Sequence, residues 1–215
     1  MVELSTPLSG VGANAEASPL DATARSRLAG NLAAAFVDDP IIDWIAPGEH
    51  RRARFFASLL SGLRPPATWV QTTPDEDAAA VWVPSERLKA APTLRELLAV
   101  PGMLSAAGVW RSQRLARFGL SLQARHPNEV PHDYLLLLGV RPRARRRGAG
   151  STLLSSHLRR LDRVGRGAFL ETANPSNIPF YERHGFEQLE AFRPVGGGPW
   201  LWSMWRPPGP ARAEP

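Results

Sequence analysis

A turn rich in arginine and glycine lies in the second half of the chain, between an apolar run and a helical pattern. Residues 145–150 read RRRGAG and follow the apolar segment 134–140. The first backbone N–H groups of a helix have no acceptor within the helix, so they favour an anion. Gly148 and Gly150 carry no side chain, which lets a phosphate approach the backbone closely. This spacing predicts a phosphate-binding turn.

The three arginines of the turn strengthen that prediction. Exposed cations near a helix N-terminus are disfavoured by about 0.3–1 kcal/mol each. Arg145, Arg146 and Arg147 therefore oppose the helix dipole and also repel one another. A bound polyanion would make all of these interactions favourable. The alternative is a solvated basic turn that precedes an ordinary helix.

Composition indicates a globular chain. Its 215 residues are enough for one domain of ordinary size, and 43% of them are hydrophobic. No apolar stretch reaches the length of a membrane span and no signal pattern opens the chain, so we expect a cytoplasmic protein without a membrane partner. The absence of cysteine excludes disulfides and a cysteine nucleophile. The five histidines show no metal-ligand spacing, so no metal site is predicted.

The charge balance suits two kinds of ligand. The net charge is +6, and Lys89 is the single lysine among 26 basic residues. A phosphate-bearing small molecule and a nucleic acid both fit such a balance. Residues 141–147 would be the footprint of an arginine-rich nucleic-acid binder. However, this run lies in a glycine turn, and the chain shows no helix-turn-helix or aromatic RNA-binding motif, so no nucleic acid is expected.

The hydrophobic pattern predicts the elements before the turn. Residues 1–20 lack periodicity and predict a disordered tail. Helices are expected at about 21–38, 48–63 and 109–123, and a strand hairpin at 68–71 and 78–83. Pro92 and Pro101 predict that residues 85–100 form only short helical pieces. Trp110 is expected in the core, with a contact to a ligand as its alternative role.

After the turn, the pattern predicts a helix at 151–164, a strand at 168–172 and a short helix at 176–184. Two more strands are expected at 186–192 and 200–206. A strand, a helix and a strand in so short a space imply a right-handed crossover between parallel strands. We therefore expect one α/β domain over residues 21–206 with a mixed sheet of six or seven strands, followed by a proline-rich tail at 207–215.

Two motifs in sequence order resemble those of the GNAT superfamily of N-acetyltransferases. Residues 145–150 match the signature R/Q-x-x-G-x-G/A of that family. Asn174 and Tyr181 stand seven apart and lead to Gly185 and Phe186, as in the second motif. Within the superfamily, segments such as 179–185 (PFYERHG) are most similar to puromycin N-acetyltransferase-like proteins. The family's usual first strand is hard to see in residues 10–20.

The resemblance implies a single GNAT-like domain, with helices on both faces of the sheet and a splayed central strand pair. It implies acetyl-CoA as the donor and a small-molecule primary amine as the acceptor, with an aminonucleoside-type antibiotic as one candidate. A CoA-binding relative without catalysis is an alternative. The cofactor-binding residues that it implies are Leu138, Gly139, Val140, Arg145, Arg146, Arg147, Gly148, Ala149, Gly150, Ser151, Thr152, Asn174 and Tyr181.

The resemblance also assigns catalytic roles. Tyr181 matches the general acid, since a tyrosine with a pKa of about 10 is protonated at neutral pH; packing is its alternative role. Backbone N–H groups beside a bulged central strand would stabilise an oxyanion. For the general base, Glu171 on the strand next to the cleft is one candidate. Its rivals are Asp133, Glu129, His132, Asp43 and a chain of water molecules.

The acceptor pocket is expected to be lined by tryptophan. Trp44 follows the first predicted helix, Trp82 lies in the second predicted strand and Glu171 would face the acceptor amine. Together with Trp110, these residues indicate a pocket for an aromatic or apolar amine. The pattern does not predict the identity of that amine or an oligomeric state.

Overall fold

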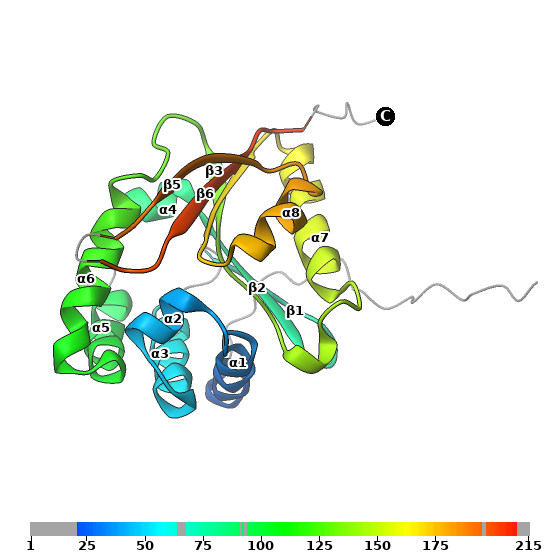
Figure 1. Ribbon diagram of the computed structural model, residues 1–215. Helices are drawn as coiled ribbons and strands as arrows, with labels where there is room; N and C mark the ends of the chain where they lie inside the picture. The colour runs from blue at the N-terminus through cyan, green and yellow to red at the C-terminus, as the bar shows by residue number, and fades with distance from the viewer. Residues whose placement is uncertain (1–20, 64–67, 91, 93, 195–196, 210–215) are drawn as a thin grey trace, which may run out of the picture.

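The computed structural model describes residues 21–63, 68–90, 92, 94–194 and 197–209 (Figure 1). The tail predicted at residues 1–20, with the doubtful strand at 10–20, lies outside the described residues, as do residues 210–215. Along the described chain the elements are α1 (Ala22–Ala35), α2 (Pro40–Ile45), α3 (Glu49–Gly62), β1 (Trp69–Thr72), β2 (Ala78–Pro84), α4 (Ser85–Lys89), α5 (Leu94–Ala107), α6 (Val109–Gln123), β3 (His132–Val140), η1 (Pro142–Ala144), α7 (Ala149–Arg163), β4 (Gly167–Thr172), η2 (Pro175–Asn177), α8 (Ile178–Glu182), β5 (Glu187–Phe192) and β6 (Leu201–Arg206).

The strands form one mixed sheet of six strands in the order β1-β2-β3-β4-β6-β5. β3 and β4 pair in parallel because α7 crosses over between them, while the other neighbours are antiparallel. The expected α/β fold with a mixed sheet is therefore confirmed. No helix in the described part of the chain is both long enough and apolar enough to cross a bilayer.

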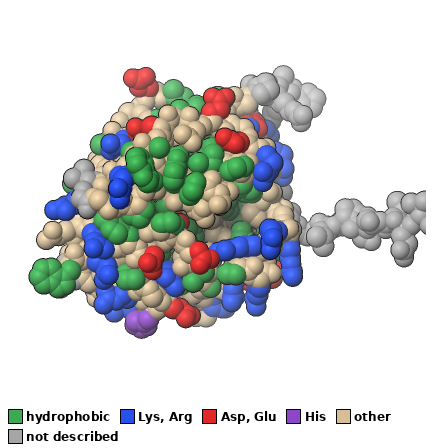
Figure 2. Space-filling view, viewed as in Figure 1, with side chains coloured by type: hydrophobic (Ala, Val, Ile, Leu, Met, Phe, Trp, Pro, Cys, Tyr) green, Lys and Arg blue, Asp and Glu red, His purple; other side chains and the backbone are tan. Residues whose placement is uncertain are grey.

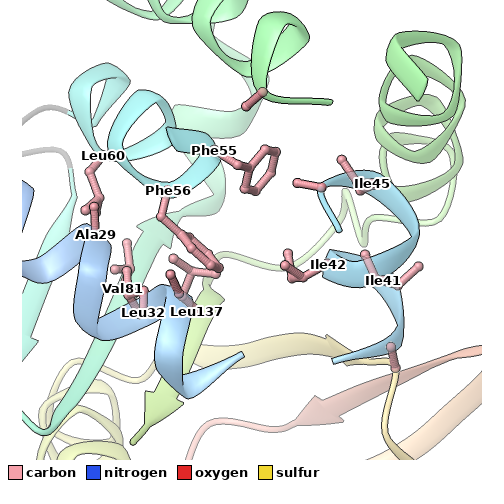
Figure 3. Close-up of a cluster of buried hydrophobic side chains, with 14 of the residues drawn as sticks. Ala29, Leu32, Ile41, Ile42, Ile45, Phe55, Phe56, Leu60, Val81 and Leu137 are labelled. Carbon is pink, nitrogen blue, oxygen red and sulfur yellow. The ribbon is translucent and has the colours of Figure 1, made fainter. Parts of the chain in front are cut away.

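Hydrophobic cores cover both faces of the sheet. On one face, Leu32 of α1, Ile42 of α2 and Phe56 of α3 pack against Val81 and Leu137 of the central strands (Figure 3). On the other face, α7 and α8 pack against the sheet through a second cluster, which includes Trp82, Leu154, Leu161, Phe186 and Met204. The two faces alternate along β2, where Ala79 and Val81 belong to the first cluster and Ala78, Ala80 and Trp82 to the second, as the strand period of two requires. The site described below lies where these layers meet.

α5 corrects the expectation of short helical pieces, because it runs without a break through Pro101. A proline inside a helix costs about 3 kcal/mol, so other contacts must offset it. Close packing on α3 does so. A Cβ added to Gly62 would lie 3.2 Å from that of Ala99, and one added to Gly102 would collide with Ser58. These two glycines let α3 and α5 approach each other closely.

Trp110 is a second correction, because it is 90% exposed and not part of the core. The helix that carries it, α6, does pack inward through Leu115, Phe118 and Leu122 at the predicted spacing. Trp110 is the second residue of that helix and lies outside this apolar stripe. Helical periodicity identified the buried face correctly, whereas residue type alone misplaced the tryptophan.

A buried polar network joins β3 to α7 at the start of the strand. The carboxylate of Asp133 accepts a hydrogen bond from His157 Nε2 at 2.9 Å and one from Arg166 at 3.0 Å, and Asp133 and His157 are each 1% exposed. Burial would raise the pKa of Asp133, but His157 and Arg166 hold that pKa below its ordinary value. Asp133 is thus a charged structural residue, which argues against it as the general base.

Candidate active site

The turn between β3 and α7 leaves backbone amides free, as the sequence predicts. Gly148 has a φ of +85° and caps α7 without a side-chain hydrogen bond. The N–H groups of Ala149, Gly150 and Ser151 form the first turn of the helix and have no acceptor within it. Arg146 has a φ of +62°, a left-handed conformation that is uncommon for a residue with a side chain. The backbone of this turn is therefore held in a special shape.

Next to the turn, β3 and β4 separate. Their parallel pairing extends only from His132–Gly167 to Tyr134–Phe169, although β3 continues to Val140. The pairing of β2 with β3 also shifts register between Val81 and Trp82, so that β3 carries one extra residue at this point. β3 is thus both bulged and splayed from β4. This geometry agrees with the splayed central strand pair that the resemblance implies.

A cleft of about 510 Å³ opens at the splay. It runs between the turn before α7, the end of β3, the helix α8 and the segment that joins α1 to α2. Figure 2 shows acidic side chains over the region that α1 and α2 occupy in Figure 1, with basic side chains beside them. The cleft is lined by Ala35, Phe36, Asp38, Asp39, Leu138, Val140, Ala144, Arg145, Arg146, Gly148, Ala149, Gly150, Ser151, Asn174, Asn177, Phe180, Tyr181 and Arg183.

The cleft brings together most of the residues predicted to bind the cofactor. From that set, Gly139, Arg147 and Thr152 do not line it. A side chain at Gly139 would collide with Phe36 and Leu32 of α1, so this glycine serves the packing of β3 against that helix. Arg147 is exposed outside the cleft, and Thr152 donates its N–H to the Gly148 carbonyl at 2.9 Å.

Arg145 holds the two sides of the cleft together. Its guanidinium donates to the carbonyls of Ala35 at 2.9 Å and Val140 at 3.3 Å, and it lies 3.4 Å from a carboxylate oxygen of Asp38. The arginine cluster is therefore not uniform. Arg145 ties the end of α1 to β3, while Arg146 and Arg147 are exposed.

Tyr181 enters the cleft from α8. Its ring packs edge-on against Phe180 and Phe186, with centroids 5.1 and 5.9 Å away. Burial raises the pKa of the Tyr181 hydroxyl well above its ordinary value, and the negative charge of Asp39 raises it further. The hydroxyl is thus fully protonated at neutral pH. Asn174 precedes this helix and accepts the Ser176 N–H at 3.0 Å, which shapes the turn after β4.

Glu171 lies on the part of β4 that has separated from β3. Both of its carboxylate oxygens are buried and have no hydrogen-bond partner among the described residues. Burial raises the pKa of Glu171 to about 8. The Tyr134 hydroxyl lies close enough to oppose this shift, although no hydrogen bond between the two meets normal geometry. Glu171 does not line the cleft. The side chains between Glu171 and the cleft would have to move before a substrate or a water molecule could reach its carboxylate.

The tryptophans expected around the acceptor lie elsewhere. Trp82 is 0% exposed and stacks on His157, with ring centroids 4.3 Å apart, so the expectation that it lines the pocket is wrong. β2 directs this side chain into the core beneath α7, the face opposite α1. Trp44 is half-buried on α2, and its ring packs under Arg114 at 5.3 Å. It does not line the cleft.

Three rivals for the general base also lie away from the cleft. His132 is buried, with its Nε2 atom 2.9 Å from that of His126. Asp43 lies 3.9 Å from Arg52, and Glu129 is exposed in the loop before β3. In the described residues no group of three or more histidines and carboxylates has a geometry that could hold a metal ion.

Asp39 is one of several cleft residues that the sequence did not predict, together with Asp38, Phe180 and Arg183. The hydrophobic pattern places the end of the first helix at about residue 38 and gives Asp39 no role in a site. An aspartate followed by proline is also a common beginning of a helix, because the aspartate caps it and proline fits its first position. Asp39 Oδ1 does accept the Ile42 N–H at 2.9 Å. That capping bond places the carboxylate in the cleft with Tyr181.

Comparison with known proteins agrees with this geometry. Residues 112–188 match the family described as acetyltransferase (GNAT) domain, and this stretch contains both the turn and Tyr181. Residues 112–188 therefore resemble a GNAT acetyltransferase domain. A structure described as histone acetyltransferase HPA2 and related acetyltransferase from Corynebacterium glutamicum superposes with a TM-score of 0.62 at 22% identity. That alignment covers 91% of this chain and 97% of the other.

Two further solved structures have a similar fold. A polyamine N-acetyltransferase from Drosophila melanogaster, described as forming N-acetylagmatine, has a TM-score of 0.55 at 18% identity, covering 87% of this chain and 96% of the other. The C-terminal condensation domain of Ebony, in complex with beta-alanyl-dopamine, has a TM-score of 0.56 at 13% identity, covering 88% and 97%. At these low sequence identities, the similarity shows a shared fold and nothing more.

Proposed function

We propose that this GNAT domain is an acetyl-CoA-dependent N-acetyltransferase that acts directly on a primary amine of a small molecule. One observation carries the proposal. A single cleft contains the free amides of the α7 turn at one end and the protonated hydroxyl of Tyr181 at the other. An anion site and a proton donor in one cleft are what acyl transfer from a phosphate-bearing donor requires.

The residues of the cleft fit acetyl-CoA. A Cβ added to Gly150 would lie 3.3 Å from Val140 Cγ2 and 3.7 Å from Phe180 Cζ, so the absent side chain is what leaves room between β3 and α8. The amides of residues 149–151, with Arg146, would hold the pyrophosphate. The exposed edge of β3 near Leu138 would hold the pantetheine. When bound, acetyl-CoA supplies the acetyl thioester.

Tyr181 is proposed as the general acid. Its raised pKa keeps the hydroxyl proton in place at neutral pH, which suits a donor that must protonate a leaving thiolate. Its ring is 7% exposed and fixed by Phe180 and Phe186, so the hydroxyl has a defined position. Tyr181 can therefore hold a proton at one point of the cleft wall.

Glu171 is proposed as the general base. A carboxyl group with a pKa of about 8 is partly ionised near neutral pH and is basic enough to accept a proton from an ammonium ion. At pH 7 about a tenth of it is ionised. The bulged, unpaired edge of β3 would provide backbone N–H groups for a developing oxyanion.

Direct transfer is expected, without an acetylated enzyme. The chain contains no cysteine that could carry the acetyl group as a thioester. Initial-rate plots with both substrates varied should therefore intersect. Parallel lines together with an acetylated protein in mass spectra would contradict direct transfer.

The arginine run gives little support to nucleic-acid binding. Arg141 donates to Asn31 at 3.0 Å, Arg143 pairs with Asp77 at 2.6 Å and Arg145 binds the end of α1. Three of these cations therefore interact with the protein's own residues. Binding to DNA that falls steeply with salt and is unaffected by free CoA would favour the nucleic-acid alternative.

The experiment is a screen of primary amines for acetyl-CoA-dependent release of free thiol, with puromycin, phenethylamine and agmatine in the panel. An aminonucleoside antibiotic remains one candidate acceptor, as the resemblance to puromycin N-acetyltransferase-like proteins suggests. Thiol release that requires an amine and yields the acetylated amine would support the proposal. Binding of acetyl-CoA without turnover of any amine would favour a CoA-binding relative that lacks catalysis.

A further inference from the structure

Three aspartates, Asp38, Asp39 and Asp43, lie just before or within α2, and their surroundings differ. Asp38 has 72% of its side chain exposed and lies 3.4 Å from Arg145. Asp43 has 65% exposed and lies 3.9 Å from Arg52. Asp39 is half-buried, and among the described residues no arginine or lysine forms an ion pair with it. Asp38 and Asp39 both line the cleft, and of these three aspartates Asp39 is thus the one without an ion-pair partner among the described residues.

The position of Asp39 is fixed by the backbone. Its Oδ1 atom accepts the Ile42 N–H at 2.9 Å as the cap of α2, and a second bond comes from the Ile41 N–H. These bonds orient the carboxylate without neutralising its charge. Burial raises the pKa of Asp39, and the hydrogen bonds from the backbone of Ile42 and Ile41 oppose that shift.

Asp39 lies at the reactive end of the cleft. Its charge acts on the Tyr181 hydroxyl, whereas Arg145, Arg146 and the free amides belong to residues 145–151. Arg183 at the end of α8 also lines the cleft, but it forms no ion pair with Asp39 in the described part of the chain. The cleft thus combines an anion site at the α7 turn with an unpaired carboxylate close to the proposed acid. A phosphate-bearing donor is negatively charged and cannot neutralise the Asp39 carboxylate. This carboxylate therefore lacks a cationic partner.

We infer that Asp39 binds the ammonium group of the acceptor and holds it next to Tyr181. The inference rests on the proposed function, because it assigns the acceptor end of the same cleft. The acceptor class is then an amine that arrives as a cation, and Asp39 determines specificity for it. The proton that the ammonium loses afterwards passes to water in the cleft, and through water to Glu171, which does not itself line the cleft.

The test compares Asp39→Asn with the wild-type protein. Asparagine is isosteric and is an equally good helix cap, so α2 should form normally while the charge is lost. Asp43→Asn is the matched control, since it makes the same change in the same helix at an exposed position outside the cleft. Kinetics are measured with puromycin, phenethylamine and agmatine, together with calorimetric titration of acetyl-CoA and the melting temperature.

Asp39→Asn should raise KM for each accepted amine on the order of 10- to 100-fold, as expected when a charged hydrogen-bond partner is lost. Its affinity for acetyl-CoA and its melting temperature should match those of the wild type and of Asp43→Asn. An unchanged amine KM would overturn the inference while leaving the proposed function intact. A changed affinity for acetyl-CoA together with an unchanged amine KM would also overturn the inference, because Asp39 would then contact the donor.

If the wild-type protein acetylates none of the three amines, the proposed function fails and the inference fails with it. If Asp39→Asn melts well below the wild type, Asp39→Ser provides the second variant, because serine also caps helices and also removes the charge. A serine variant that melts normally and keeps the wild-type amine KM would overturn the inference. An increase in KM in both variants would support it.

Discussion

At the scale of single residues, Tyr181 provides the sharpest test of the proposed chemistry. Tyr181→Phe removes one hydroxyl and keeps the ring that packs against Phe180 and Phe186. General acid catalysis contributes about 10²–10⁴-fold, so kcat should fall by a factor in that range. Acetyl-CoA affinity, measured by calorimetry, and the melting temperature should stay the same.

Two results would remove Tyr181 from this role. A phenylalanine variant with nearly wild-type kcat would show that the residue only packs. A variant that loses stability and acetyl-CoA binding together would show a structural hydrogen bond, and its lower rate would carry no information on acid catalysis.

Glu171 predicts a particular dependence of the rate on pH. A general base must be ionised, and burial raises the pKa of Glu171 to about 8. The value of kcat/KM should therefore rise with pH and level off above about pH 8. Glu171→Gln should lower kcat/KM and abolish that rise. Glu187→Gln, a change on the exposed strand β5, should leave the profile unchanged. A profile with the same rise in the Glu171→Gln variant would assign the titration to another group or to water.

The sequence predicted the positions of single residues correctly where backbone conformation determines them. It predicted them incorrectly where side-chain packing determines them. Gly148 and Gly150 predicted a special turn, and the positive φ of Gly148 and the narrow space at Gly150 agree with that prediction. Trp82 and Trp110 were misplaced because an aromatic residue type does not specify a face. Asp39 was missed because its role depends on a cleft formed by four distant segments, which no local pattern reveals.

At the scale of elements, the network at Asp133 fixes β3 against α7. Asp133→Asn would leave the buried His157 and the partly buried Arg166 without their charged partner. Breaking a buried pair in this way costs about 3–5 kcal/mol of unfolding free energy. The melting temperature should therefore fall on the order of 10 °C. Asp43→Asn loses only a long 3.9 Å ion pair between an exposed carboxylate and Arg52, which also donates to the Ala33 carbonyl, so it should melt within a degree or two of the wild type.

A loss of less than about 1 kcal/mol in Asp133→Asn would contradict this account of the network. Denaturant unfolding followed by circular dichroism measures the difference directly, with the same slope required of both proteins. Such a small effect would mean that water or a neighbouring group replaces the lost carboxylate.

The elements themselves were largely predictable from hydrophobic period and helix caps. The strand β3, the helix α7 and the strand β4 follow the predicted order and boundaries within a few residues. α5 is the exception, because proline was expected to break it. Two glycines allow α3 and α5 to pack closely enough to compensate, and that tertiary contact cannot be seen in the local sequence.

At the scale of the whole molecule, the buried His132 and His157 and the half-buried His126 predict lower stability in acid. Burial lowers the pKa of His126 to about 4 and also lowers the pKa values of His132 and His157. In the unfolded chain these groups bind protons below about pH 6.5, whereas in the folded protein they resist protonation. The unfolded state thus takes up more protons as pH falls, so stability falls with it.

The melting temperature should decrease by several degrees between about pH 7.5 and about pH 5.5. His126→Gln should make this decrease smaller, because one of the three resisting groups is gone. His50 lies at the start of α3 and is exposed, so His50→Gln serves as the control and should melt like the wild type at both values. A melting temperature that stays constant across this range would contradict neutral, buried histidines.

The central claim is that acetyl-CoA binds in the cleft beside Gly150, and calorimetric titration of acetyl-CoA tests it most directly. Gly150→Val places a side chain where a Cβ already lies 3.3 Å from Val140 Cγ2, while Gly119→Val makes the same change on α6, where no atom lies within 4 Å. We predict that the wild type and Gly119→Val bind acetyl-CoA with similar affinity and that Gly150→Val loses at least about tenfold, or about 1.4 kcal/mol. Equal affinity in all three folded proteins, or no binding by the wild type, would contradict the account.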